Sequence, residues 1–270
     1  MMKTTWTSLV VVALAVTMVF PVVALDKEQA AAARKVFAAN KDAVVFLTGV
    51  TQVELSAGGQ TFEREGEFQA IGTVIDPSGL VVTSLSLIGA SGEQGTGAQR
   101  VVIKVKRHEQ VKIVLADGTE VPADVVLKDP DLDLAFLAPR KDSPEYKDAT
   151  WTVVQFDPAA KVQEFDIGIN ISRLAKSFNL EAVSASGEIS GVVTKPRKFY
   201  FGPTRPGVPI FNLDGKVIGL TILYKPPGDE SSRAVVVLPA EDILKIAQQA
   251  KDAKPVEEEE PSAKATTDEE

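Results

Sequence analysis

The sequence has no cysteine among its 270 residues and a single histidine, His108. The absence of cysteine excludes disulfide bonds, thiol nucleophiles and cysteine-ligated zinc. A single histidine excludes clusters of imidazole ligands, and no acidic run has the spacing of a calcium-binding loop. His108 lies in the charged stretch Lys106–Gln110, a context typical of a surface residue. We therefore expect neither a metal nor a cofactor.

Basic character is also lacking, because the formal net charge is −8. Nucleic-acid binding calls for a basic patch or stripe, so it is not expected here. Much of the negative charge lies at the end of the chain, where residues 251–270 hold three lysines and eight acidic residues. No large apolar residue follows Val256. Residues 251–270 are therefore predicted to form an acidic, disordered tail.

The first residues have the layout of a secretory signal. Lys3 precedes the apolar run Leu9–Phe20, and small or β-branched residues lead to Ala24. Residues 1–24 are predicted to be a signal peptide cleaved after Ala24, which makes the protein periplasmic or secreted. The alternative is an uncleaved anchor and hence a membrane attachment, although a membrane span needs about 20 apolar residues. Export without disulfides favours a bacterial envelope.

Most of the body, from Ala43 to about Leu238, consists of short β-type runs separated by turn signals such as Asp117-Gly118 and Asp214-Gly215. The alternation of Glu63, Glu65 and Glu67 indicates the solvent-facing side of a hairpin. A capping box at Asp26–Gln29 predicts a helix over about 30–37. An apolar face over residues 240–250 predicts a second, C-terminal helix.

Three segments of this body together resemble the HtrA/Deg-like family of trypsin-fold serine proteases. They are residues 72–88, with a strand, an Asp-Pro-Ser-Gly turn and a second strand, residues 111–137, and residues 202–223. The resemblance implies an all-β fold of two six-stranded antiparallel β-barrels with short N- and C-terminal helices. It places the domain at 25–250, with one barrel at about 43–140 and the other at about 150–238. No PDZ domain is expected between the last helix and the tail.

The resemblance also assigns the positions of the family's catalytic triad. The aspartate is Asp133, the histidine position holds Ser86, and the serine position holds Pro206. A shifted alignment does not restore the triad, because His108 lies far beyond Ser86 and no serine occurs between Ser190 and Ser231. A serine–lysine pair using Ser86 is an alternative, but no lysine has a spacing that suggests it.

These replacements remove the chemistry of the family. A hydroxyl attacks only when an adjacent base takes its proton, and the aspartate merely orients that base. Proline has no N–H, so Pro206 also removes a backbone donor that the family uses to bind the oxyanion. The spacing of Pro203, Pro206 and Pro209 predicts a stiff, extended loop. No active catalytic residue is therefore expected.

The sequence favours a secreted, catalytically inactive protease homologue that binds protein or peptide clients in the cell envelope. Two alternatives stay open: an active serine endopeptidase of the HtrA/Deg-like family, and a structural subunit of an envelope complex. A homo-oligomer is compatible with the resembled family, in which trimers occur. Neither the client nor the oligomeric state follows from the residues.

Overall fold

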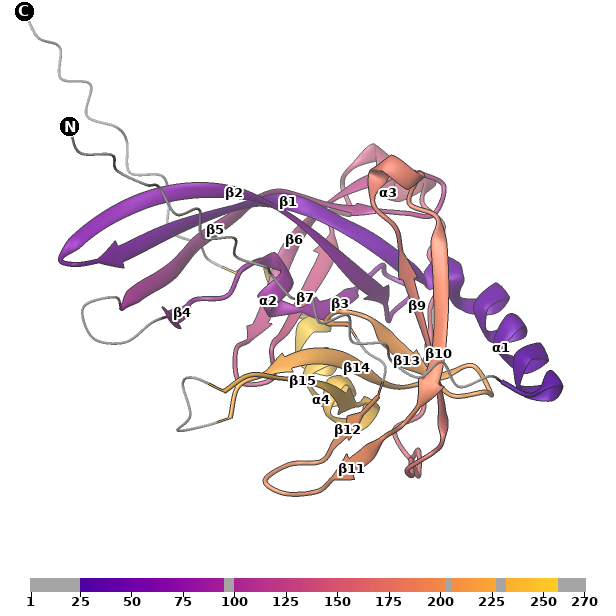
Figure 1. Ribbon diagram of the computed structural model, residues 1–270. Helices are drawn as coiled ribbons and strands as arrows, with labels where there is room; N and C mark the ends of the chain where they lie inside the picture. Colours follow the sequence, from indigo (N-terminus) through magenta and orange to yellow (C-terminus); the bar gives the residue numbers. More distant parts are fainter. Residues whose placement is uncertain (1–24, 95–99, 203–204, 227–231, 257–270) are drawn as a thin grey trace, which may run out of the picture.

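Two curled β-sheets lie against each other in the computed structural model of the chain, with a helix near each end (Figure 1). The structure describes residues 25–94, 100–202, 205–226 and 232–256. The predicted signal peptide, residues 1–24, lies outside this part. In the described part, no helix combines the length and the apolar character needed to cross a membrane.

The first sheet closes into a barrel. Its strands are β1 (Val44–Ala57), β2 (Gln60–Val74), β3 (Val81–Ser84), β4 (Gly92–Gln94), β5 (Val101–Val114), β6 (Glu120–Asp129) and β7 (Leu134–Pro139). They follow the order β1-β2-β3-β7-β6-β5-β4, and a further antiparallel pairing of β1 with β5 completes the ring. The closed barrel therefore has six strands, with β4 added at the edge of β5.

Three strands of this barrel continue beyond it as an arm, which we define as residues 50–67 of β1 and β2 together with 101–109 of β5 (Figure 1). The hairpin turns at Gly58 and Gly59, whose φ angles are 57° and 80°. Positive φ at both central residues is the requirement of a two-residue type I′ turn, which glycine meets without strain. The sequence indicated a hairpin here, but the arm is much longer than the runs that predicted it.

The second sheet contains β8 (Gln155–Phe156), β9 (Ile167–Arg173), β10 (Ala182–Glu188), β11 (Gly191–Val193), β12 (Phe199–Phe201), β13 (Pro209–Phe211), β14 (Lys216–Tyr224) and β15 (Ala234–Pro239). Their order is β10-β9-β13-β14-β15-β12-β11, and β8 pairs with β14. This sheet is a curled half-barrel, since β10 and β11 end the order in the described part. The predicted double-barrel fold is confirmed, with the second barrel more open than the first.

Helices occupy both ends of the described chain. Helix α1 (Lys27–Asn40) begins with the predicted capping box, in which Asp26 accepts from the N–H of Gln29 and Gln29 bonds back to the N–H of Asp26. Helix α4 (Ala240–Lys251) follows β15 and buries Ile243 and Ala247. Shorter helical turns are η1 (Lys41–Ala43), α2 (Leu85–Ile88), α3 (Pro144–Asp148) and η3 (Lys176–Phe178).

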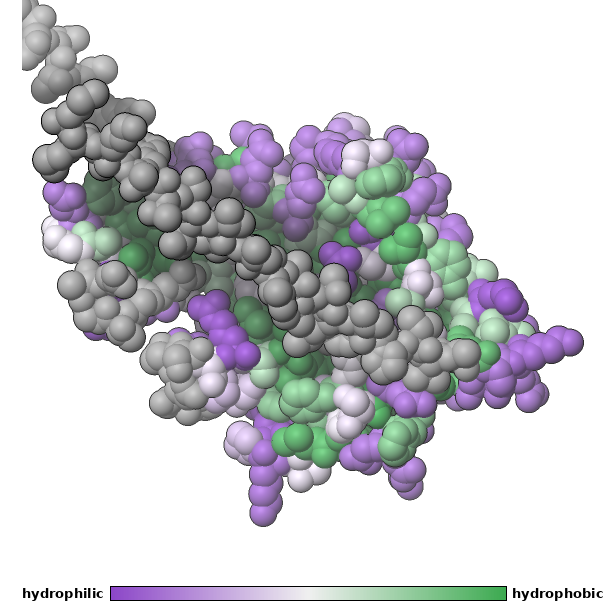
Figure 2. Space-filling view, viewed as in Figure 1, coloured by the Kyte–Doolittle hydropathy of each residue, from purple (hydrophilic) through white to green (hydrophobic). Residues whose placement is uncertain are grey.

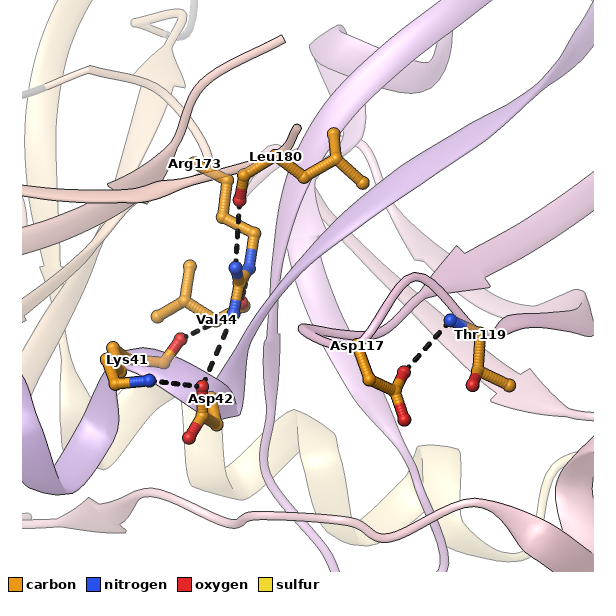
Figure 3. A network of polar contacts seen from close by, with 7 residues as sticks. All are labelled: Lys41, Asp42, Val44, Asp117, Thr119, Arg173 and Leu180. Carbon is orange, nitrogen blue, oxygen red and sulfur yellow. Dashed lines mark hydrogen bonds and ion pairs between the residues drawn. The ribbon is translucent and has the colours of Figure 1, made fainter. Parts of the chain in front are cut away.

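The two sheets share an apolar core. Phe136 of the first sheet and Leu80, directly before β3, pack in the same cluster as Leu220 of the second sheet and Ile243 of α4. A buried arginine adds a polar connection between the sheets (Figure 3). Arg173 of β9 donates to the carbonyl oxygens of Val44, Lys41 (2.8 Å) and Leu180 (2.9 Å).

The structure describes the first residues of the predicted acidic tail, up to Val256. The N–H of Val256 donates to the carbonyl oxygen of Val125 at 2.9 Å, and the Val256 side chain packs against the first barrel. The contact covers the apolar side chain of Val256, and no local sequence signal indicated it. Residues 257–270 lie outside the described part.

Candidate functional site

The structure brings Ser86 and Asp133 together where the first sheet faces the second. Ser86 lies in α2, directly after β3, and Asp133 ends the turn between β6 and β7. The N–H of Leu85 donates to the backbone carbonyl oxygen of Asp133 at 2.8 Å, which holds the two segments in register. Asp133 has a φ of 52°, an uncommon value for a residue with a side chain.

The Asp133 carboxylate accepts hydrogen bonds from three residues. Its Oδ1 accepts from the N–H of Ser86 at 2.7 Å, and its Oδ2 accepts from the N–H of Leu223 at 2.8 Å. The hydroxyls of Ser84 and Ser86 also donate to Oδ2, the latter at 3.2 Å. The two serine oxygens are 2.8 Å apart. The carboxylate is thus held by β3, α2 and β14 at once.

Two opposing effects act on the acidity of Asp133, whose exposed fraction is 6%. Burial is the larger effect and raises the pKa of its carboxyl, because a charged group loses hydration. Hydrogen bonds from Ser84, Leu223 and Ser86 lower the pKa and so offset part of the rise. A carboxylate with this many donors acts as an anchor for the surrounding chain.

Pro206 lies in a tight turn, which differs from the extended loop that the sequence predicted. The N–H of Val208 donates to the carbonyl oxygen of Arg205 at 3.2 Å, and Gly207 has a φ of 80°. Proline followed by glycine at the two central positions defines a type II β-turn. The first proline of the predicted loop, Pro203, lies outside the described residues. Pro209 begins β13.

Gly207 fits against the first barrel without room for a side chain. A Cβ at this position would lie 2.7 Å from Cδ1 of Leu87 and 2.9 Å from the carbonyl oxygen of Ile71. The N–H of Gly207 donates to the carbonyl oxygen of Thr221 in β14 at 2.8 Å. The turn 205–208 therefore lies between the two sheets, next to the helical turn that carries Ser86.

The single histidine packs elsewhere on the first barrel. His108 lies within β5, where its ring meets Phe68 edge to face at 6.2 Å between centroids. Its Nε2 is 3.0 Å from the carbonyl oxygen of Ile88. The side chain is half-buried and not the free surface residue that the charged context suggested. Its ring nitrogen is therefore engaged by the end of α2.

A pocket of about 190 Å³ adjoins Ser86 and Asp133. Leu85, Leu223 and Ile103 supply apolar wall, while Lys225 and Arg233 supply positive charge. Figure 2 shows hydrophobic residues in the hollow between the arm and the second sheet. The presence of Lys225 brings a lysine to the same pocket as Ser86, which sequence spacing did not suggest.

Sequence reasoning missed two contributors to this site, Ser84 and the backbone N–H of Leu223. Nothing distinguishes Ser84 from other serines in the sequence, and a backbone donor has no sequence signal. The turn at Pro206-Gly207 did have one, because this dipeptide is characteristic of a type II turn. No group of three or more potential metal ligands converges in the part of the chain that the structure describes.

Comparison with known protein families shows which family this chain belongs to. Residues 70–220, more than half of the sequence, match the trypsin-like peptidase domain. The chain belongs to this family. No curated protein matches the sequence of this trypsin-like domain.

Solved structures confirm the relationship at the level of the fold. The HtrA-type protease AlgW, in a structure with a tripeptide, superposes with a TM-score of 0.54 at 15% sequence identity. The match covers 82% of this chain and 64% of that one. The trypsin-like domain therefore spans less than two thirds of the length of this HtrA-type structure. At this identity, the similarity concerns the fold.

Proposed function

We propose that this chain is a catalytically inactive trypsin-like protease homologue that binds peptide or protein clients in the cell envelope. The observation that carries the proposal is the type II turn at Arg205–Val208, with Pro206 at the position that the family resemblance assigns to the nucleophile. Proline has neither a hydroxyl nor an N–H, so the position offers no nucleophile and no oxyanion donor.

A second replacement, separate from Pro206, supports the proposal: the position of the histidine base holds no histidine. Ser86 has the position that the resemblance assigns to the histidine, and its N–H and hydroxyl both donate to Asp133. A serine hydroxyl does not accept a proton near neutral pH, and the oxygens of the Asp133 carboxylate already accept from Ser84, Ser86 and Leu223, so neither residue takes the part of the family's histidine base. The sequence has one histidine, and Nε2 of that residue, His108, contacts Ile88.

The pocket beside Asp133 supports the binding part of the proposal. It is bounded by Leu223 at the end of β14 and by Ile103 of the arm. Apolar walls with a few charged groups are typical of ligand sites. The envelope location rests on residues 1–24, the predicted signal peptide.

Activity assays test the inactive state directly. The wild-type protein and a Pro206→Ser variant should both fail to cleave casein or fluorogenic peptides and should show no serine labelled by a fluorophosphonate. Cleavage or specific labelling in either protein would contradict the proposal. A Ser86→His/Pro206→Ser double variant asks whether the turn itself also blocks the chemistry, and we expect it to stay inactive.

Peptide binding needs a separate experiment. A photo-crosslinkable peptide library should label the wild-type protein, and Ile103→Glu should reduce the labelling because it places a charge in the pocket wall. Val183→Glu is the matched control, since Val183 is exposed on β10. A pull-down from envelope extract that recovers one stoichiometric partner and no peptides would favour a structural subunit instead.

A further inference from the structure

Within the described part of the chain, one edge of the arm has no strand beside it. Residues 61–69 of β2 pair with β1 on one side, whereas the pairing of β2 with β3 is confined to Thr73 and Val74. Figure 1 shows β2 as the outer margin of the arm. The opposite edge is covered, because β4 pairs with β5 and the hydroxyl of Ser91 accepts from the N–H of Val105 at 2.9 Å.

The hairpin register tells which backbone groups of β2 point outward. A two-residue turn is closed by a hydrogen-bonded pair, here Ala57 with Gln60, and such pairs recur at every second residue. The even-numbered residues of β2 therefore bond to β1, and the odd-numbered ones face away. The barrel end of β2 agrees, because the carbonyl of Ile71 accepts from the hydroxyl of Thr83 and Thr73 pairs with β3.

Five residues thus present outward N–H and C=O groups along one line: Thr61, Glu63, Glu65, Glu67 and Gln69. All five are exposed. No backbone hydrogen bond joins them to another described segment besides β1. Such a row of donors and acceptors is a template for a further strand.

The side chains along this edge select which strand it accepts. Glu63, Glu65 and Glu67 point to the same face, where Lys106 pairs with Glu63 at 3.3 Å and Gln52 donates to Glu65 at 3.0 Å. Each carboxylate has several acceptor sites, and an added strand would place alternate residues directly opposite all three. A second copy of β2 would bring like charges together, which disfavours self-pairing. The chain's own tail is equally unsuitable, because residues 257–260 are all glutamate.

We propose that the outer edge of β2 binds an extended segment of a partner polypeptide with lysine or arginine at alternate positions. The partner adds a strand to the arm through the backbone of residues 61–69, and its basic side chains face Glu63, Glu65 and Glu67. On the other face of the arm, Phe62 has an exposed fraction of 52% and offers apolar contact. This surface is separate from the Ser86–Asp133 site and does not depend on the function proposed for it.

Binding of synthetic peptides to the full chain tests the charge pattern. A peptide of about nine residues, the length of the free edge, carries lysine at alternate positions with threonine between them. We expect it to bind at least ~10-fold more tightly than a peptide of the same composition with consecutive lysines, and added salt should weaken it. Fluorescence anisotropy measures both. Equal affinity for the two peptides would overturn the proposal.

Backbone pairing has its own control. The alternating peptide with N-methyl groups on the backbone nitrogens of the lysines keeps its charge but loses the hydrogen-bond donors that face residues 61–69 in an antiparallel pairing, and we expect it not to bind. In the protein, Glu65→Pro should abolish binding without unfolding the arm, because the N–H of residue 65 points outward. Glu65→Gln keeps that N–H and should retain most of the affinity. If binding survives both the N-methylation of the peptide and Glu65→Pro in the protein, charge attraction alone accounts for it and strand addition is refuted.

Charge reversal of the edge completes the test. The Glu63→Lys/Glu65→Lys/Glu67→Lys variant should no longer bind the lysine peptide and should instead bind a peptide with alternating glutamates. The control reverses three other exposed acids, Glu28, Glu145 and Asp148, with the same change in net charge. If the control loses the lysine peptide to the same degree, overall charge and not the edge would be responsible. Circular dichroism verifies that all variants are folded.

Discussion

Asp133 has a structural task at the position that the family resemblance assigns to the triad aspartate. Its carboxylate accepts the N–H groups of Ser86, in α2 directly after β3 of the first sheet, and of Leu223, in β14 of the second sheet. Buried donors left without an acceptor are costly, so this aspartate contributes to the stability of the junction. Retention of the residue at a triad position is therefore not evidence of catalysis.

Replacement of Asp133 by asparagine tests this structural role. The amide offers one acceptor oxygen where the carboxylate offers two, so one of the two partly buried N–H groups loses its partner. We expect the free energy of unfolding to fall by about 1–3 kcal/mol, measured by urea denaturation. Ser86→Ala keeps both backbone bonds and should cost less. Equal stability of Asp133→Asn and wild type would show that the carboxylate is dispensable.

At the same scale, the sequence predicted the meeting of Ser86 and Asp133 but not the details of their contacts. The family motifs assigned Ser86 and Asp133 to the triad positions, and the fold brings these two residues together. The half-buried packing of His108 was not predictable, because it depends on Phe68 and Ile88 from other strands. The dipeptide Pro206-Gly207 is typical of a type II turn. The close approach of this turn to Ile71 depends on how the two sheets pack, which the local sequence does not specify.

Among the elements, α4 is fastened to the turn between β2 and β3 by one ion pair. Nζ of Lys251, the last residue of α4, is 2.6 Å from Oδ2 of Asp76. The hydrogen bond from Lys251, helped by the N–H of Ser78, lowers the pKa of Asp76 to about 2. A depressed carboxyl pKa stabilises the fold above its ordinary value near 4, and this contribution is lost as the pH falls toward 2.

Lys251→Met should expose that dependence. At neutral pH we expect a loss of roughly 0.5–1 kcal/mol, because Lys251 is half exposed and solvent screens the pair. The difference between variant and wild type should shrink between pH 4 and about pH 2, followed by urea denaturation at each pH. Lys254→Met removes an exposed lysine just beyond the helix and should have no such pH-dependent effect. A constant difference at all pH values would contradict the assignment.

The arm shows the limit of sequence prediction for an element. Alternating glutamates indicated a hairpin, and Gly58-Gly59 marks its turn. Its length was not predicted, although Val53, Leu55 and Ala57 of β1 alternate with polar residues and pair with the apolar Val105, Ile103 and Val101 of β5. The pairing of two strands far apart in the sequence is what defines such an arm, and local propensity does not reveal it.

Across the whole molecule, one buried side chain reaches both sheets. Arg173 has an exposed fraction of 6% and donates to carbonyl oxygens of η1, β1 and the segment before β10. Burial lowers the pKa of its guanidinium, and the nearby charge of Asp42 opposes that shift. The planar fork of arginine suits several acceptors at once. The double-barrel fold followed from the family motifs, but this link did not.

Arg173→Met should destabilise the protein by about 3 kcal/mol, since three carbonyl groups lose their donor in a buried place. Arg173→Lys should recover only part of this loss, because one ammonium does not span the three acceptors. Thermal and urea denaturation followed by far-UV circular dichroism measure the effect. Arg197→Met, at an exposed position, is the control. A loss below about 1 kcal/mol, the size of a surface effect, would argue against a role in joining the sheets.

The type II turn at residues 205–208 has a consequence for any attempt to redesign this loop. Gly207 fills a space between Leu87 and Ile71 that admits no side chain, so the turn is part of the junction between the sheets. A substitution that reshapes the turn therefore also disturbs that junction, and its cost in stability is separate from any effect on chemistry.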